Sequence, residues 1–206
     1  MISAIILAAG KSERMSRPKQ LMPWQQSTVL EQTVDNFLGS KANEVIVVVG
    51  YRAEEVGRVL AAKPVRRVIN PDYEQGMSAS IIAGLSLVDD QTQAVMLALG
   101  DQPLINSQTI NRLIDEFSGC DKGIVIPTYR GRRGHPVIFA MTYKEQLLQL
   151  KGDIGGRQII ARHPEDVLEV AVDCEGVCID IDTVESYCSI KSDSECQGGK
   201  LHESRH

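Results

Sequence analysis

Short apolar runs alternate with stretches of helical periodicity along most of the chain. Runs such as AIILA, EVIVVV and AVMLAL are continuously apolar, which is typical of strands covered on both faces of a sheet. Strands that alternate with helices indicate βαβ units, so we predict an α/β fold with a mostly parallel sheet and helices on both faces. The predicted strands are residues 4–8, 44–49, 65–69, 94–99, 123–126, 137–139, 167–172 and 177–179. The predicted helices are residues 28–38 (with Ser27 as N-cap), 53–62, 77–88, 107–117, 142–150, 155–162 and 183–190.

The alternating pattern ends near residue 190. A chain of 206 residues fits one large domain, and we predict a single domain over residues 1–190. Residues 191–206 are polar and contain a Gly-Gly pair, which predicts a disordered tail. No apolar run reaches the length of a membrane span and no basic leader precedes the first strand, so we expect a cytoplasmic protein without membrane contact.

The charge of the chain is unevenly distributed. Its net charge of −5 makes it a poor candidate for binding nucleic acid. Against this background Lys11, Arg14, Arg17 and Lys19 crowd one loop, with only Glu13 opposing them. Basic charge concentrated in one loop of an acidic protein indicates a small anionic ligand rather than a polymer.

Five cysteines are scattered along the chain, and their odd number argues against a disulfide framework. Cys174 and Cys178 are separated by three residues, but no second close pair of Cys or His accompanies them as in a structural zinc site. We therefore expect thiols in a reducing compartment.

The basic loop contains Gly-Lys-Ser at residues 10–12, the end of a P-loop motif. Counting back places Ile5, inside the first predicted strand, where the motif requires its first Gly. Pro18 and Pro23 interrupt the helix that should follow. The chain also lacks the G-x-G-x-x-G of a dinucleotide site. The small residues Ala8, Ala9 and Gly10 nevertheless let backbone N–H groups approach a phosphate closely.

Each chemically suggestive stretch follows a predicted strand: AAGKSERM, NPDYEQGMS, GDQP and DIDT. Ligands of parallel α/β sheets bind at the carboxyl ends of the strands, so we expect these stretches to meet. Asp101, at the end of the AVMLAL strand, is well placed for Mg²⁺, although it could also serve the helix at 107–117. Asp180 and Asp182 face the same side if the stretch is extended, so spacing alone does not choose between them.

The stretch LAAGKSERMSRPKQLMP resembles the signature of nucleotidyltransferases with a Rossmann-like, sugar-nucleotide-transferase type of fold. Together with GMSAS, GDQP, GRRGHPVIF, GDIGGR and DIDT it most resembles the molybdenum cofactor cytidylyltransferases, over roughly residues 2–190. The resemblance implies Mg²⁺-dependent transfer of CMP from CTP to the molybdopterin cofactor, with release of pyrophosphate. It also implies transient contact with a molybdenum-dependent apoenzyme. The chain departs from the pattern at Ser16, where Gly is usual, and at Val184 and Ser186, where Pro and Asp are frequent.

The resemblance also assigns roles to individual residues. It implies that Lys19 reaches the α-phosphate, that Arg14 grips the β,γ-phosphates, and that Asp182 joins Asp101 at the metal. The implied catalytic residues are Lys19, Arg14 and Asp101. The implied nucleotide-binding residues are Leu7, Ala8, Ala9, Gly10, Ser12, Arg14, Lys19, Gly76, Ser78 and Asp101. The implied acceptor-binding residues are Ser80, Gln102, Gly134, His135, Asp153 and Arg157.

Three alternatives remain open at this point. A related transferase could use GTP on the same acceptor, or CTP on a different phosphorylated acceptor. A non-catalytic protein could bind the cofactor and deliver it to an apoenzyme. Such a carrier needs no metal-binding carboxylates, so the presence of Asp101 and Asp182 favours an enzyme.

Overall fold

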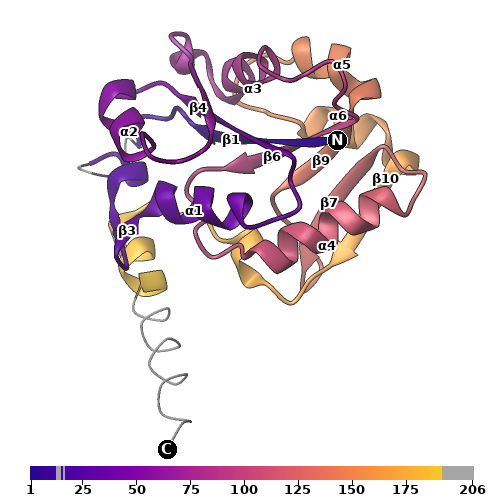
Figure 1. The fold of residues 1–206 in the computed structure, drawn as a ribbon. Helices are drawn as coiled ribbons and strands as arrows, with labels where there is room; N and C mark the ends of the chain where they lie inside the picture. The colour runs from indigo at the N-terminus through magenta and orange to yellow at the C-terminus, as the bar shows by residue number, and fades with distance from the viewer. Residues whose placement is uncertain (13–14, 16, 192–206) are drawn as a thin grey trace, which may run out of the picture.

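A computed structural model describes residues 1–12, 15 and 17–191. An eight-stranded sheet forms its centre, and helices lie on both faces (Figure 1). The main strand order is β10-β7-β9-β6-β1-β4-β5, and the short strand β8 pairs with β7. The strands are β1 (Ile2–Ala8), β4 (Glu44–Val49), β5 (Arg66–Ile69), β6 (Ala94–Leu99), β7 (Ile124–Tyr129), β8 (Arg132–Arg133), β9 (Val137–Ala140) and β10 (Val167–Ala171). The helices are α1 (Val29–Leu38), α2 (Ala53–Val59), α3 (Met77–Leu85), α4 (Ser107–Ser118), α5 (Lys144–Leu148) and α6 (Arg157–Arg162).

The sheet is mostly parallel, which confirms the predicted fold class. β1 pairs in parallel with β4 and with β6, β4 with β5, and β7 with β10. β9 runs antiparallel between β6 and β7. The connection from β7 to β9 is short, so the chain turns back instead of crossing over through a helix. As a result, the carboxyl ends of β1, β6 and β7 all lie at one edge of the sheet.

Both faces of the sheet are buried because successive side chains of a strand point in opposite directions. In β1, Ala4 and Ile6 pack in one core with Leu30 of α1, while Ile5 packs in the other core with Ile81 of α3. Helices α1, α2 and α4 contribute to the first core, and α3, α5 and α6 to the second. This two-sided burial explains the continuously apolar strands in the sequence.

Most predicted elements are present, with shifted ends, and two predictions are wrong. Thr28, rather than Ser27, caps α1, because it forms a reciprocal capping box with Glu31. Residues 177–179, predicted as a strand, belong largely to a 3₁₀ helix, Glu175–Cys178. The hairpin of β2 (Pro23–Trp24) and β3 (Ser27–Thr28) was not predicted, since strands of two residues leave no periodic signal.

A small third core joins this hairpin to the last described part of the chain. Trp24 and Val29 pack with Ile181 and Tyr187, the latter on a helical segment at 184–191. The predicted tail at 191–206 lies almost wholly outside the described residues. Among the helices of the described ranges, none combines the length and apolarity that crossing a membrane requires.

Candidate active site

The chemically suggestive stretches meet at the carboxyl ends of β1 and β6. They surround a cavity of about 390 Å³. Its lining residues come from the end of β1 and the loop after it, from the start of α3 and the turn before it, from the end of β6, from the segment after α5 and from the segment around residue 181. They are Leu7, Ala9, Gly10, Lys19, Gln20, Tyr73, Gly76, Met77, Ser80, Leu99, Gly100, Asp101, Asp153, Asp180 and Asp182.

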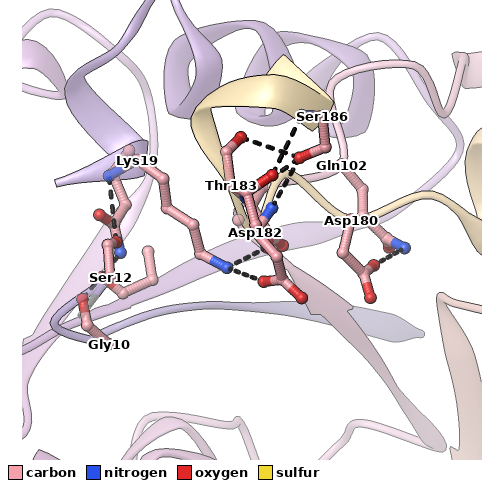
Figure 2. A network of polar contacts seen from close by, with 12 residues as sticks. Gly10, Ser12, Lys19, Gln102, Asp180, Asp182, Thr183 and Ser186 are labelled. Atoms are coloured by element: carbon pink, nitrogen blue, oxygen red, sulfur yellow. Dashed lines mark hydrogen bonds and ion pairs between the residues drawn. The ribbon is translucent and has the colours of Figure 1, made fainter. Parts of the chain in front are cut away.

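Lys19 lies between two carboxylates at this cavity (Figure 2). Its ammonium donates to Asp101 and, over 3.1 Å, to Oδ1 of Asp182. The side chain of Asp101 is 7% exposed and that of Lys19 20%, whereas Asp182 is 49% exposed. Three residues that are far apart in sequence therefore form one charged cluster at the edge of the sheet.

Burial and charge shift the pKa values in this cluster. Burial disfavours the Lys19 ammonium, but the two carboxylates outweigh this and raise its pKa. Burial raises the pKa of Asp101, and Lys19 offsets only part of the rise. Burial and the neighbouring Asp182 raise the pKa of Asp180. Three carboxylates, of Asp101, Asp180 and Asp182, line the same cavity as the Lys19 ammonium, so a further cation would be stabilised there.

The structure distinguishes the two carboxylates that spacing left equivalent. Asp182 contacts Lys19 and so faces Asp101, while Asp180 accepts a 2.7 Å hydrogen bond from Nε2 of Gln102 (Figure 2). Gln102, predicted to bind the acceptor, is 1% exposed and is not among the residues that line this cavity. Its role in the structure is to hold Asp180.

The loop after β1 is shaped by a residue that sequence reasoning missed. Nε2 of Gln20, itself 3% exposed, donates to the backbone oxygens of Ala8 at 3.1 Å and of Gly10 at 3.2 Å. The Lys19 N–H donates to Oγ of Ser12, 3.1 Å away. The sequence signal available was a long polar residue beside Lys19, but nothing in it indicated burial. Arg14 lies outside the described residues.

This loop does not continue as a P-loop would. Its described part leads into a 3₁₀ turn, Lys19–Leu21, and not into an α-helix. Ala9 is 3% exposed and lies close to Gly50, where an added Cβ would come within 2.9 Å of the Ala9 Cβ. The loop is therefore packed tightly against the end of β4.

The start of α3 is covered by the segment after α5. Asp153 Oδ1 accepts from the Met77 N–H at 3.0 Å, and the Gly152 carbonyl accepts from the Ser78 N–H at 3.1 Å. Gly76 has a φ of 99°, and a Cβ there would lie 2.6 Å from the Gly152 backbone. The backbone N–H groups of residues 77 and 78 are thus bonded within the protein.

Ser78 and Ser80 of α3 are placed differently. The Ser78 hydroxyl is buried and has no hydrogen-bond partner among residues 1–12, 15 and 17–191, and Ser78 does not line the cavity. Ser80 lines the same cavity as Lys19 and Asp101 and accepts a hydrogen bond from Asn70 at 3.1 Å. Ser80, predicted to contact the acceptor, lies on the side predicted for the nucleotide.

A second cavity, of about 490 Å³, adjoins the first. Its walls are largely apolar, and Gly134, His135, Asp153 and Arg157 lie along it. Both cavities are lined by Leu7, Met77, Leu99 and Asp153, so they share one boundary. Four of the six predicted acceptor residues therefore line the second cavity, which adjoins the one that holds the Lys19 cluster.

The position of His135 follows from Gly134. A Cβ on Gly134 would lie 2.1 Å from the Val177 carbonyl, so only glycine allows the chain to pass there. The His135 N–H then donates to that carbonyl at 2.9 Å. Burial, reinforced by the positive charge of Arg157, lowers the pKa of His135, so its imidazole is neutral at pH 7.

The donor set at the first cavity fits a divalent cation that arrives with a polyphosphate. Mg²⁺ is typically held by one or two carboxylates plus substrate phosphates, and Asp101 and Asp182 supply two. Both already share one cation, the Lys19 ammonium. In the described ranges no three His, Cys, Asp or Glu side chains cluster to hold a metal by themselves. The Cys174 and Cys178 thiols contact the carbonyls of Leu104 and Arg132.

Comparison with known proteins identifies relatives along nearly the whole chain. The model of the MobA-like NTP transferase domain matches residues 4–167. The chain is 30% identical over 191 residues to the molybdenum cofactor cytidylyltransferase of Escherichia coli K12, covering 92% of this chain and 95% of that protein. It is also 30% identical to the nicotine blue oxidoreductase of Paenarthrobacter nicotinovorans, covering 89% and 93%.

Solved structures with the same fold also cover nearly the whole chain. Rv0371c of Mycobacterium tuberculosis H37Rv superposes with a TM-score of 0.84 at 32% identity, covering 93% of this chain and 97% of that one. A structure of Rv0371c in complex with manganese superposes with a TM-score of 0.80 at 29% identity, covering 93% and 98%. The resemblance drawn from the sequence motifs is therefore confirmed at the level of the family.

Proposed function

Because the chain belongs to the family of MobA-like NTP transferase domains, we propose that it transfers CMP from CTP to the molybdopterin cofactor and releases pyrophosphate. One observation carries the proposal: Lys19 is held between Asp101 and Asp182 at the rim of a cavity beside the loop after β1. Nucleotidyl transfer needs cations for the triphosphate and carboxylates for a metal, and this cluster offers both.

In the proposed reaction, an oxygen of the acceptor phosphate attacks the α-phosphorus of CTP. A new P–O bond forms, and the bond to the pyrophosphate oxygen breaks. Lys19 neutralises charge that develops on the α-phosphate, which lowers the barrier because the interaction strengthens in the transition state. Ala9 and Gly10, which line the first cavity, are small enough for the nucleotide to approach the backbone, whereas Ala8 is buried in the core. Asp101 and Asp182 would hold Mg²⁺, which supplies electrophilic activation of the phosphate.

The acceptor is proposed to bind in the second cavity. Arg157 offers positive charge there for an anionic group, and neutral His135 can exchange a hydrogen bond. Since the two cavities share Leu7, Met77, Leu99 and Asp153, substrates in both would meet at that boundary. The cytidylyltransferase relative, similar over almost its full length, supports CTP and the molybdenum cofactor as substrates.

Sequence identity alone does not distinguish nucleotidyl transfer from an oxidation–reduction reaction. The chain is 30% identical both to the molybdenum cofactor cytidylyltransferase and to the nicotine blue oxidoreductase. The site favours transfer, since a paired lysine and two carboxylates suit a metal–polyphosphate complex and have no evident use in electron transfer. We retain transfer from GTP, a different phosphorylated acceptor and a non-catalytic delivery protein as alternatives. We also propose magnesium as the metal, a cytoplasmic location and transient contact with a molybdenum-dependent apoenzyme.

The test is pyrophosphate release by the purified chain with Mg²⁺, molybdopterin cofactor, and either CTP or GTP. We expect release that requires the acceptor and is faster with CTP. Preference for GTP would contradict cytidylyl transfer. Tight cofactor binding without pyrophosphate release from either nucleotide would favour a delivery protein.

A further inference from the structure

Reciprocal hydrogen bonds between Thr183 and Ser186 cap the helical segment that follows Asp182. The Ser186 hydroxyl accepts hydrogen bonds from the backbone N–H of Asp182 at 3.3 Å and of Thr183 at 3.1 Å (Figure 2). It donates to the Thr183 carbonyl at 2.9 Å. In return, Oγ1 of Thr183 accepts from the Ser186 N–H at 3.1 Å. One neutral hydroxyl thus fixes two successive backbone groups at the start of the helical segment 184–191.

The residue before Asp182 is fixed from the other side. Ile181 is fully buried against Trp24 and Tyr187. Its N–H donates to the backbone carbonyl of Asp101 at 3.3 Å. The backbone on both sides of Asp182 is therefore tied down, once to the Asp101 backbone and once to Ser186.

The Asp182 side chain itself has little support. It is 49% exposed, and its described side-chain partner is the Lys19 ammonium. If Lys19 turns to a phosphate, the direction of this carboxylate depends on the backbone that carries it. Only the Ser186 contact acts directly on the Asp182 N–H among the described hydrogen bonds.

We propose that Ser186 is a positioning residue that keeps the Asp182 carboxylate facing Asp101, so that both can share one divalent cation. The proposal rests on the metal site in the proposed function. A serine suits this place because its hydroxyl both accepts from the Asp182 N–H and donates to the Thr183 carbonyl, which an ionised aspartate cannot do. It also adds no negative charge beside three existing carboxylates.

The experiment measures Mn²⁺ binding by electron paramagnetic resonance in the presence of a non-hydrolysable CTP analogue and without acceptor. We expect Ser186→Ala to weaken Mn²⁺ binding roughly 10-fold, the lower end of what partners of metal ligands contribute. Ser186→Thr keeps the hydroxyl and should restore binding. Ser189→Ala, an exposed change on the same helical segment, should bind Mn²⁺ like the wild type.

A double variant separates positioning from simple helix capping. In an Asp182→Asn background, Ser186→Ala should cause no further loss of Mn²⁺ affinity, because the carboxylate that it orients is already gone. Wild-type affinity in Ser186→Ala, or equal losses in Ser186→Ala and Ser189→Ala, would overturn the proposal. Weakened binding in Ser186→Ala from a protein that shows no nucleotidyl transfer would uphold the positioning role while rejecting the proposed function.

Discussion

Replacing Lys19 with Met probes both the stability and the chemistry of the charged cluster. The variant leaves the buried Asp101 beside Asp182 without their shared cation. Breaking a fully buried pair costs roughly 3–5 kcal/mol, but Asp182 is half exposed and screened, so we expect a loss of about 2 kcal/mol. For a chain of this size, that lowers the Tm by about 4–8 °C.

Lys41→Met is the matched control. Lys41 also pairs with a carboxylate, Asp115, at 2.7 Å, but both side chains are more than half exposed. Exposed pairs contribute under about 1 kcal/mol, so its Tm should fall much less. Added Mg²⁺ should raise the Tm of Lys19→Met more than that of the wild type, because the ion replaces the missing cation.

The kinetic consequence is separate from the stability loss. If Lys19 stabilises charge on the α-phosphate, Lys19→Met should lower kcat at least about 100-fold while the KM for CTP changes under about 10-fold. Thermal unfolding without metal and steady-state kinetics below the Tm check the two parts. A destabilisation no larger than that of Lys41→Met would refute the electrostatic reasoning. An effect confined to KM would refute the catalytic assignment.

Three further predictions follow from other parts of the structure. Asp101→Asn and Asp182→Asn should each lower kcat at least about 100-fold, because each removes a proposed metal ligand. Asp180→Asn removes the same charge two residues away from Asp182, and its kcat should stay within about 10-fold of the wild type. Equal losses in all three variants would mean that the cluster acts only through its total charge. Ala9→Gly should reduce the ratio of kcat/KM for CTP to kcat/KM for GTP without inverting the preference. One methyl group in a close-fitting pocket contributes about 1–3 kcal/mol to the discrimination between two substrates. An unchanged ratio would show that Ala9 does not determine the choice of nucleotide. Asp166 accepts hydrogen bonds from Tyr143 at 2.5 Å and Gly123 at 2.8 Å, which outweigh its burial and lower its pKa. The ionised Asp166 therefore stabilises the folded state at pH values above its unfolded-state pKa, near 4. This stabilisation is lost as the pH falls through the lower pKa of the folded state. Urea unfolding should show Asp166→Asn destabilised by about 1–2 kcal/mol at pH 7, and by less at pH 3; a constant difference would contradict this sign.

The parallel sheet was predictable because its strands are long and buried on both faces. A run such as AVMLAL carries the same signal wherever it stands in the sheet. The antiparallel course of β9 was not predictable, because a short apolar strand reads the same in both directions. Ser27 and Thr28 are both good N-caps, and only the Glu31 partner decides between them.

The candidate active site also contains features that were predictable from the sequence and features that were not. Asp101 follows β6 and Lys19 belongs to the loop after β1, so the rule that ligands bind at the carboxyl ends of strands brings these two together. Asp182 was expected beside them because residues 177–179 were predicted as a strand, although they belong largely to a 3₁₀ helix. The buried positions of Gln20 and Gln102 were not predictable, because their hydrogen bonds join them to residues that no local pattern places beside them. The occupation of the α3 start by Asp153 is likewise a tertiary contact that no local pattern indicates.

The most direct test of nucleotidyl transfer at this site follows the labelled phosphorus of [α-³²P]CTP. We predict that the wild-type chain moves the label into covalent linkage with molybdopterin cofactor, with one pyrophosphate released for each label transferred, and that Asp101→Asn does not. Label that remains in CTP or appears only as free CMP, or transfer undiminished in Asp101→Asn, would contradict the assignment of this cluster as the centre of a cytidylyl transfer.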